Sequence, residues 1–254
     1  MTEEQAAYEG LFRRLSRIDE IAMRAGLLVE QLSSLELADG LQLVEDAYRG
    51  AALGLPDAQR SLLALGWSLF DPRLEKRRAA LGLAARQEGR HWLSDMLLAA
   101  APTDEVGEDT ARRVPDFGRG RPLTLGERKS LARTHDRDLI QRVVRDPHPD
   151  VVRILLDNPA LTEEDVVRLS AIRPNDPDVL RAVYRHPRWV VRYRPRHAIV
   201  RNPACPLDIG LLLVPHLRTA ELKEAAMASG LAAPLRLSCR MILELRDAQP
   251  TALG

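Results

Sequence analysis

Apolar side chains recur every three or four residues through the first hundred positions, a spacing that lines one face of an α-helix. The opening segment shows it at Tyr8, Leu11, Leu15, Ile18 and Ala22. Ser33 or Ser34 is a candidate N-cap for a second helix over residues 35–54. Further helices are predicted over residues 57–70 and, as one long helix or two short ones, over 73–100. Strict alternation of apolar and polar residues is absent, so the pattern predicts no sheet.

The pattern changes between residues 101 and 122, which read APTDEVGEDTARRVPDFGRGRP. Proline, glycine and charged residues dominate here, and such a segment buries little apolar surface and interrupts helices. We predict a linker or long surface loop at 101–122. It separates a helical N-terminal region (1–100) from the rest of the chain (123–248).

Beyond Pro122 the sequence repeats itself. Leu123-Thr124 and Leu161-Thr162 open similar segments, LTLGERKSLAR and LTEEDVVRLSA. DLIQRVVRDP from Asp138 resembles DVLRAVYRHP from Asp178, and VVRILLDNPAL resembles VVRYRPRHAIVRNPAC, which carries a short insertion. Repeats of about 40 residues with two or three helices each are typical of stacked α-solenoids.

Proline gives these repeats a physical basis. Each predicted helix runs about ten residues and ends at an Asp-Pro, His-Pro or Asn-Pro pair. Proline disfavours helical geometry in the preceding residue and has no amide hydrogen to continue the helix. Short helices of this kind bury their apolar stripes only by stacking on their neighbours. We therefore predict an all-α protein, an α-solenoid of short stacked helices that follows a helical N-terminal region and ends in C-terminal capping helices.

Two stretches, DPHPDVVRILLDNPALT and HPRWVVRYRPRHAIVRNPACP, resemble the leucine-rich repeat variant family and, more loosely, HEAT repeats. The resemblance covers residues 123–217 and implies a helical repeat architecture. One relative in that repeat class carries an iron–sulphur cluster on an N-terminal cysteine cluster. This chain has only Cys205 and Cys239, so the resemblance implies no cofactor here.

Charge is unevenly distributed, although the whole chain has a net charge of only +1. Residues 118–201 contain 18 Lys+Arg against 11 Asp+Glu, whereas residues 1–117 contain 14 against 20. Arginines and aromatics cluster in the later repeats, and Arg, Trp and Tyr are common anchors of binding energy. The predicted partner-binding residues are Arg181, Tyr184, Arg185, Arg188, Trp189, Arg192, Tyr193, Arg194, Arg196 and Arg201.

A second interpretation treats the same cluster as architecture. The arginine stems then cover apolar seams, their guanidinium groups pair with Asp150, Asp157 and residues 163–165, and Trp189 packs between repeats. A third assigns the cluster to nucleic acid, with arginines on phosphates and exposed aromatics on bases, as in HEAT-like proteins that bind DNA.

Catalytic chemistry finds little support, because the chain lacks GxxxxGK[ST], GxGxxG, HExxH and GxSxG. Histidines 135, 148, 186 and 197 have no metal-ligand spacing, and no small-molecule substrate is suggested. No apolar run approaches the ~20 residues of a membrane span, and the acidic first residues do not resemble a signal peptide. We expect a cytoplasmic, non-enzymatic scaffold that binds a partner protein, with an acidic or phosphorylated segment as ligand. Nucleic acid is the alternative partner.

Overall fold

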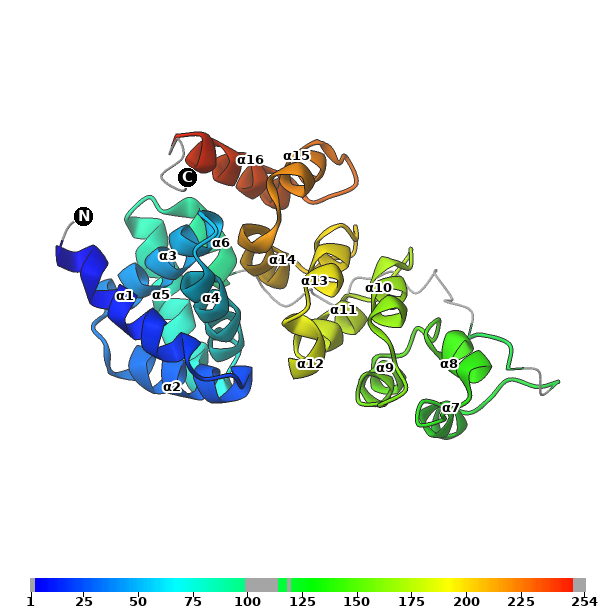
Figure 1. The fold of residues 1–254 in the computed structure, drawn as a ribbon. Coiled ribbons are helices and arrows are strands. Elements are labelled where there is room, and N and C mark those ends of the chain that lie inside the picture. Colours follow the sequence, from blue (N-terminus) through cyan, green and yellow to red (C-terminus); the bar gives the residue numbers. More distant parts are fainter. Residues whose placement is uncertain (1–2, 99–113, 118–119, 249–254) are drawn as a thin grey trace. The chain divides into compact units, whose positions relative to one another are not determined.

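The computed structural model describes residues 3–98, 114–117 and 120–248 (Figure 1). Every regular element in these ranges is a helix and none is a strand, so the all-α prediction is confirmed. The chain divides into two compact units. One comprises Met1–Ala100 with Leu207–Gly254, and the other comprises Ala101–Pro206.

The first unit is a bundle in which the predicted breaks at Gly54–Pro56 and Asp71-Pro72 separate helices. Its elements are α1 (Glu3–Ser16), α2 (Ile21–Ser34), α3 (Leu37–Ala52), α4 (Pro56–Leu69), the 3-10 turn η1 (Pro72–Leu74), α5 (Glu75–Gln87), α6 (His91–Leu98), α14 (Leu207–Leu213), the 3-10 turn η2 (Val214–His216), α15 (Thr219–Met227) and α16 (Ala233–Asp247). Helix α4 packs against α1, α2 and α3, and α5 packs against α6. Gly82 allows the α5–α6 approach, because a Cβ there would lie 2.5 Å from Leu98.

Two local predictions in this region are wrong. The apolar face drawn from Tyr8 to Ala22 is interrupted at residues 17–20, and Ala22 is exposed while Ile21 is buried. The Ser33 and Ser34 hydroxyls donate to carbonyls within α2, so neither serine caps the next helix. Serine can satisfy its hydroxyl on a preceding turn of its own helix, and this option competes with capping.

Helices α14 to α16 belong to the first unit, whereas the sequence grouped residues 207–248 with the repeats. Helix α14 packs against α4 and α6, and α16 packs against α3 and α6. The buried hydroxyls of Tyr48 and Ser238 share a hydrogen bond of 2.6 Å, and Arg246 Nε donates to the Ala52 carbonyl at 2.6 Å. Helix α14 is buried along nearly all of its length, and such a helix requires neighbours without specifying which ones.

The second unit contains the segments whose sequences resemble one another. Its helices are α7 (Leu125–Leu131), α8 (Arg137–Val143), α9 (Pro149–Leu156), α10 (Glu163–Ala171), α11 (Pro177–Tyr184), α12 (Pro187–Val190) and α13 (Tyr193–Val200). Helix α9 packs against α7, α8 and α11, and α13 packs against α10, α11 and α12. The described parts of the predicted 101–122 linker, residues 114–117 and 120–122, contain no helix; the remainder lies outside the described residues.

Equivalent helices in the second unit begin with equivalent caps. Thr124 and Thr162, 38 residues apart, each form a reciprocal capping box, with Glu127 and Asp165 respectively. Asp136 and Asp176, 40 residues apart, each accept the amide hydrogen two residues ahead. His148 and His186 do the same through Nδ1. These side chains satisfy amides that a helix start leaves without partners.

Prolines begin helices here as well as separating them. Pro149, Pro177 and Pro187 each occupy the first helical position, where the missing amide hydrogen costs nothing. The insertion noted in the sequence divides the third helix of the later repeat into α12 and α13, where the earlier repeat has the single helix α9.

Two buried asparagines, Asn158 and Asn202, each link the turn in which they lie to a segment about 24 to 32 residues earlier. Asn158 Nδ2 donates to the carbonyls of Ala132 (2.9 Å) and Thr134 (2.7 Å), and its Oδ1 accepts from the Ala160 amide (2.9 Å). Asn202 makes the equivalent bonds: its Nδ2 donates to the carbonyls of Ser170 (2.8 Å) and Ile172 (2.9 Å), and its Oδ1 accepts from the Ala204 amide (3.0 Å). The Asn-Pro pairs of the sequence are therefore inter-segment bridges as well as turns.

Asn158→Ala is expected to destabilise the second unit by about 2 kcal/mol, because it leaves two buried carbonyls and one amide without their partner. Hydrogen exchange measured by mass spectrometry on the full chain should show faster exchange in α7 and α10. Ser130→Ala, at an exposed position on α7, is the control and should change neither helix. Unchanged exchange in the Asn158 variant would contradict this role.

Candidate functional site

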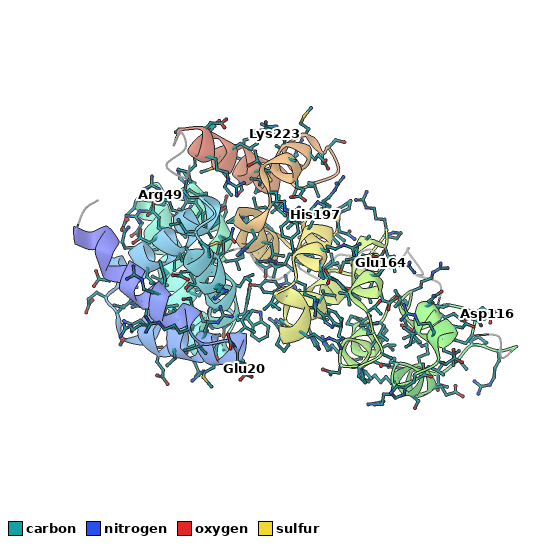
Figure 2. All side chains as sticks on the ribbon, in the orientation of Figure 1. Glu20, Arg49, Asp116, Glu164, His197 and Lys223 are labelled. Carbon is teal, nitrogen blue, oxygen red and sulfur yellow. The ribbon has the colours of Figure 1, made fainter. Side chains whose placement is uncertain are left out.

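The ten predicted binding residues all lie on α11, α12, α13 and the turns that follow them in the second unit. Glu164 on α10 and His197 on α13, both labelled in Figure 2, mark two of the helices around the cluster. The side chains do not form one surface. Tyr184 and Trp189 are each only 1% exposed and belong to the core.

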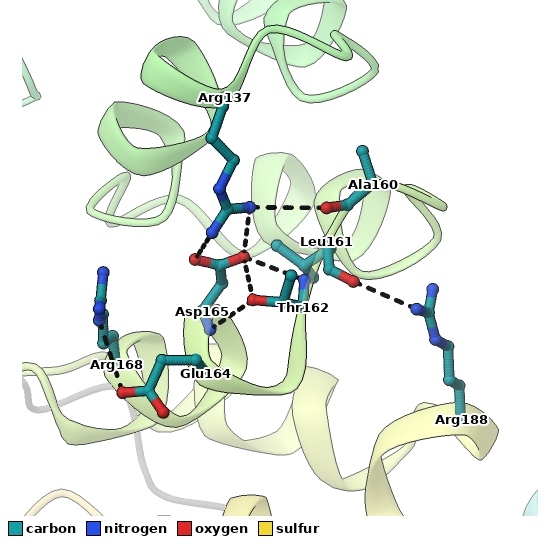
Figure 3. Close-up of polar contacts among 8 residues, drawn as sticks. All are labelled: Arg137, Ala160, Leu161, Thr162, Glu164, Asp165, Arg168 and Arg188. Atoms are coloured by element: carbon teal, nitrogen blue, oxygen red, sulfur yellow. Dashed lines mark hydrogen bonds and ion pairs between the residues drawn. The ribbon is translucent and has the colours of Figure 1, made fainter.

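Trp189 is held from two sides. Its indole nitrogen donates to the Leu156 carbonyl on α9 at 2.9 Å, and the Arg188 guanidinium lies 4.3 Å from the ring centroid. Arg188 also donates to the carbonyl oxygens of Asn158 (3.4 Å) and Leu161 (3.1 Å), the second of which is drawn in Figure 3. These contacts join α12 to the segment between α9 and α10.

Arg192 and Arg194 form ion pairs with α10. Arg192 Nη1 lies 3.1 Å from Glu163 Oε2, and Arg194 Nη2 lies 2.6 Å from Glu164 Oε2. Both arginine side chains are about half exposed, and pairs of this kind contribute ~0–1 kcal/mol. They match the architectural interpretation of the cluster, in which arginines pair with residues 163–165.

Asp165, the next residue in α10, forms the capping box with Thr162 at the start of this helix (Figure 3). Arg137 donates to both carboxylate oxygens, at 2.5 and 2.6 Å, and the Thr162 hydroxyl donates at 2.6 Å. Burial acts to raise the pKa of Asp165, but the hydrogen bonds from Arg137 and Thr162 outweigh it and the pKa is lowered. Asp165 therefore remains ionised as a link between α8 and α10.

Arg196 is largely buried beside Tyr193, with its guanidinium 5.9 Å from the ring centroid. Burial lowers the pKa of Arg196 to about 10, so the side chain is still charged at neutral pH. Arg201 follows α13, is exposed, and its carbonyl accepts a hydrogen bond from Arg173 at 2.8 Å.

Arg181 and Arg185 line a groove between α9 and α11 with a volume of about 320 Å³. The other lining residues are Arg153, Leu156, Asp157, Asp178, Ala182 and His186. Three arginines and two aspartates thus line one concave space. Of the ten predicted residues, the structure places only Arg181 and Arg185 in this groove.

The carboxylates of the groove have local partners. His186 Nε2 lies 3.1 Å from Asp157 Oδ1, and Arg181 Nε lies 3.8 Å from Asp178 Oδ1. Arg153 reaches in the other direction, to Asp150 at 2.6 Å. The Asp178 and Asp157 side chains are 59% and 82% exposed, so both stand at the open rim of the groove.

Sequence reasoning missed Arg153 and His186 as groove residues. Arg153 occupies the repeated sequence PDVVR of α9, which resembles PDVLR around Arg181 of α11. The repeat aligns α9 with α12 and α13, and α11 with α8, so this similarity alone did not indicate that Arg153 lies beside Arg181.

Among the described ranges, no three His, Cys, Asp or Glu side chains gather closely enough to hold a metal ion. The helices described there are all too short or too polar to cross a bilayer. No protein-family model, curated protein or solved structure matches the chain. The groove between α9 and α11 contains two of the ten predicted binding residues, Arg181 and Arg185.

Proposed function

We propose that the protein is a non-enzymatic α-helical repeat scaffold of the solenoid type that binds an acidic or phosphorylated segment of a partner protein. The observation that carries the proposal is the groove between α9 and α11, which Arg153, Arg181 and Arg185 line together. This site replaces the broader surface expected from residues 181–201.

The chemistry of the groove favours an anion. Guanidinium groups donate paired hydrogen bonds whose geometry matches carboxylate and phosphate oxygens. Arg181 is fixed by its surroundings, with a side chain only 11% exposed, while Arg185 is exposed. A partly buried guanidinium interacts more strongly with an anion than one fully in water, because the local dielectric is lower.

The two carboxylates limit which anion fits. Asp157 and Asp178 would repel an anion placed at the rim beside them, so the negative group is expected on the arginine side. Leu156 and Ala182 supply apolar lining next to it. A peptide segment with acidic or phosphorylated side chains and a small apolar residue satisfies both requirements.

Nucleic acid receives less support from the same observations. Base stacking requires accessible aromatic faces, and Tyr184 and Trp189 are in the core. Arg192 and Arg194, which the nucleic-acid interpretation assigns to phosphates, already pair with Glu163 and Glu164.

Charge reversal in the groove tests the proposal. The double variant Arg153→Glu/Arg185→Glu is expected to weaken binding of a fluorescein-labelled phosphoserine peptide roughly tenfold or more, because attraction becomes repulsion at two positions. Fluorescence anisotropy of the full chain with phosphoserine, glutamate and alanine versions of one peptide measures the effect. Arg181 is left unchanged because its substitution could disturb packing.

The matched control is Arg133→Glu/Arg168→Glu, which changes net charge equally at exposed positions outside the groove lining. It should alter affinity no more than about twofold, since exposed charges are screened over ~8–10 Å. Equal losses in both double variants, or no binding of any acidic peptide, would overturn the proposal. Tighter binding of a single-stranded oligonucleotide, with affinity falling linearly in log salt, would favour nucleic acid instead.

A further inference from the structure

Another groove lies beside α8 in the same unit, and it is called the first groove here because it comes earlier in the sequence. It has a volume of about 590 Å³ and is lined by Pro115, Asp116, Asp138, Gln141, Arg142 and Arg145. The last four residues belong to α8 and the turn after it, and the first two belong to the segment that precedes α7. The groove between α9 and α11 is called the second groove.

The two grooves use the same positions of equivalent helices. All four lining residues of the first groove that come from α8 or its following turn have counterparts 40 residues later in the second groove. The pairs are Asp138 and Asp178, Gln141 and Arg181, Arg142 and Ala182, and Arg145 and Arg185. Because α8 and α11 also begin at equivalent capping aspartates, the correspondence reflects the repeat and fixes the same helix face in both.

Each groove retains arginines although their positions differ. The first groove has Arg142 and Arg145, and the second has Arg181 and Arg185 with Arg153 added from α9. Arg142 donates to the Asp116 carbonyl at 3.5 Å, and both residues line the first groove. The arginine that ends the helix, Arg145 or Arg185, is common to both.

Helix α9 connects the two grooves, because it packs against both α8 and α11. Neighbouring packed helices have axes about 8–10 Å apart, so two such steps separate the axes of α8 and α11 by about 20 Å, which sets the scale of the distance between the grooves. An extended chain advances about 3.3–3.6 Å per residue. A peptide therefore needs about six residues to reach from one groove to the next.

We propose that the ligand is an extended peptide with two negative clusters about six residues apart, one seated in each groove. This inference rests on the proposed function and specifies its ligand. Two weak sites on one chain act together, because occupancy of one groove raises the effective concentration of the second cluster at the other. The first groove is lined by two arginines and two aspartates, and the second by three arginines and two aspartates, so the proposed affinity depends on both grooves acting together.

The test compares peptides that differ only in spacing. One peptide carries a single phosphoserine pair, and three carry two such pairs separated by one, six or twelve Gly/Ser residues. The six-residue spacer is expected to bind about tenfold or more tighter than the single-cluster peptide, and the one-residue spacer about equally to it, since it cannot span the grooves. The twelve-residue spacer should fall between them.

Matched variants separate this inference from the proposed function. Arg145→Glu and Arg185→Glu should each reduce the six-residue-spacer peptide to single-cluster affinity, while Arg133→Glu leaves it unchanged. If Arg145→Glu has no effect but Arg185→Glu weakens binding, the two-groove ligand is refuted and the proposed function stands. If no groove variant changes binding of either peptide, both fail.

Discussion

Asp146→Asn is expected to destabilise the second unit by about 4 kcal/mol, because it leaves the Arg128 charge buried without its counter-ion. Arg128 Nη1 lies 2.7 and 2.8 Å from the two Asp146 oxygens, and the Asp146 side chain is fully inaccessible. Asp146 Oδ1 also accepts from the His148 amide at 2.9 Å. Asparagine can keep that second bond through its own Oδ1, so the substitution isolates the ion pair.

A thermodynamic cycle with Arg128→Met completes the experiment. The double variant Arg128→Met/Asp146→Asn is expected to be more stable than Asp146→Asn alone, since it removes the orphaned charge. Urea unfolding followed by hydrogen exchange in α7 and α9 reports on this unit within the full chain. A loss below about 1 kcal/mol for Asp146→Asn, the level of an exposed pair, would show that the pair does not hold α7 to the turn before α9.

Much of the fold could be predicted from the sequence because its signals are local. Proline at positions 149, 177 and 187 marks helix starts through its fixed backbone angle, and Thr-x-x-Glu/Asp marks two more. The spacing of 38 to 44 residues between matching segments indicated equivalent structures, and the paired hydrogen bonds of Asn158 and Asn202 bear out that equivalence.

The partition of the chain into units could not be predicted in the same way. Helix α14 follows the Asn-Pro pair at 202 just as α10 follows the pair at 158, so the local pattern continues. Its packing against α4 and α6 depends on segments more than a hundred residues away. Apolar periodicity says that a face must be covered, but the covering segment is chosen by tertiary complementarity.

The arginine cluster shows the limit of composition as a guide to a site. Residues 181–201 gather arginine and aromatic side chains in sequence, but the short helices turn them in different directions. Arg188 caps carbonyls, Arg192 pairs with α10, and Arg185 faces the groove. Adjacent positions on a helix point about 100° apart, so density along a chain does not imply density on a surface.

The arginines of residues 181–201 divide between internal contacts and the groove. Three of the seven arginines in the cluster, Arg188, Arg192 and Arg194, contact α10 or the segment before it. The same residue type at Arg145 and Arg185 lies where a helix ends beside an open groove. Arginine therefore serves both for internal contacts, as in Arg192, and beside the grooves, as in Arg185, where the proposed anion would bind.

Trp189→Ala is expected to destabilise the second unit by about 4 kcal/mol, close to the loss for large aromatic truncations in well-packed cores. The ring is 1% exposed and donates to the Leu156 carbonyl at 2.9 Å. Its loss removes the contact between α12 and α9 together with the platform beneath Arg188. Hydrogen exchange in α9 and α11 to α13 measures the effect without relying on tryptophan fluorescence.

Trp189→Phe distinguishes packing from a surface role. Phenylalanine keeps much of the buried volume but cannot donate to Leu156, so a loss of about 1–2 kcal/mol is expected. Val191→Ala, two residues on and 46% exposed, should change stability by less than about 0.5 kcal/mol. If Trp189 instead served as a contact for partners, both Trp189 variants would leave stability unchanged and weaken peptide binding. Because Trp189 lies in the core, we expect both variants to lower the stability of the second unit. Peptide binding is then expected to weaken only as a consequence of that lower stability.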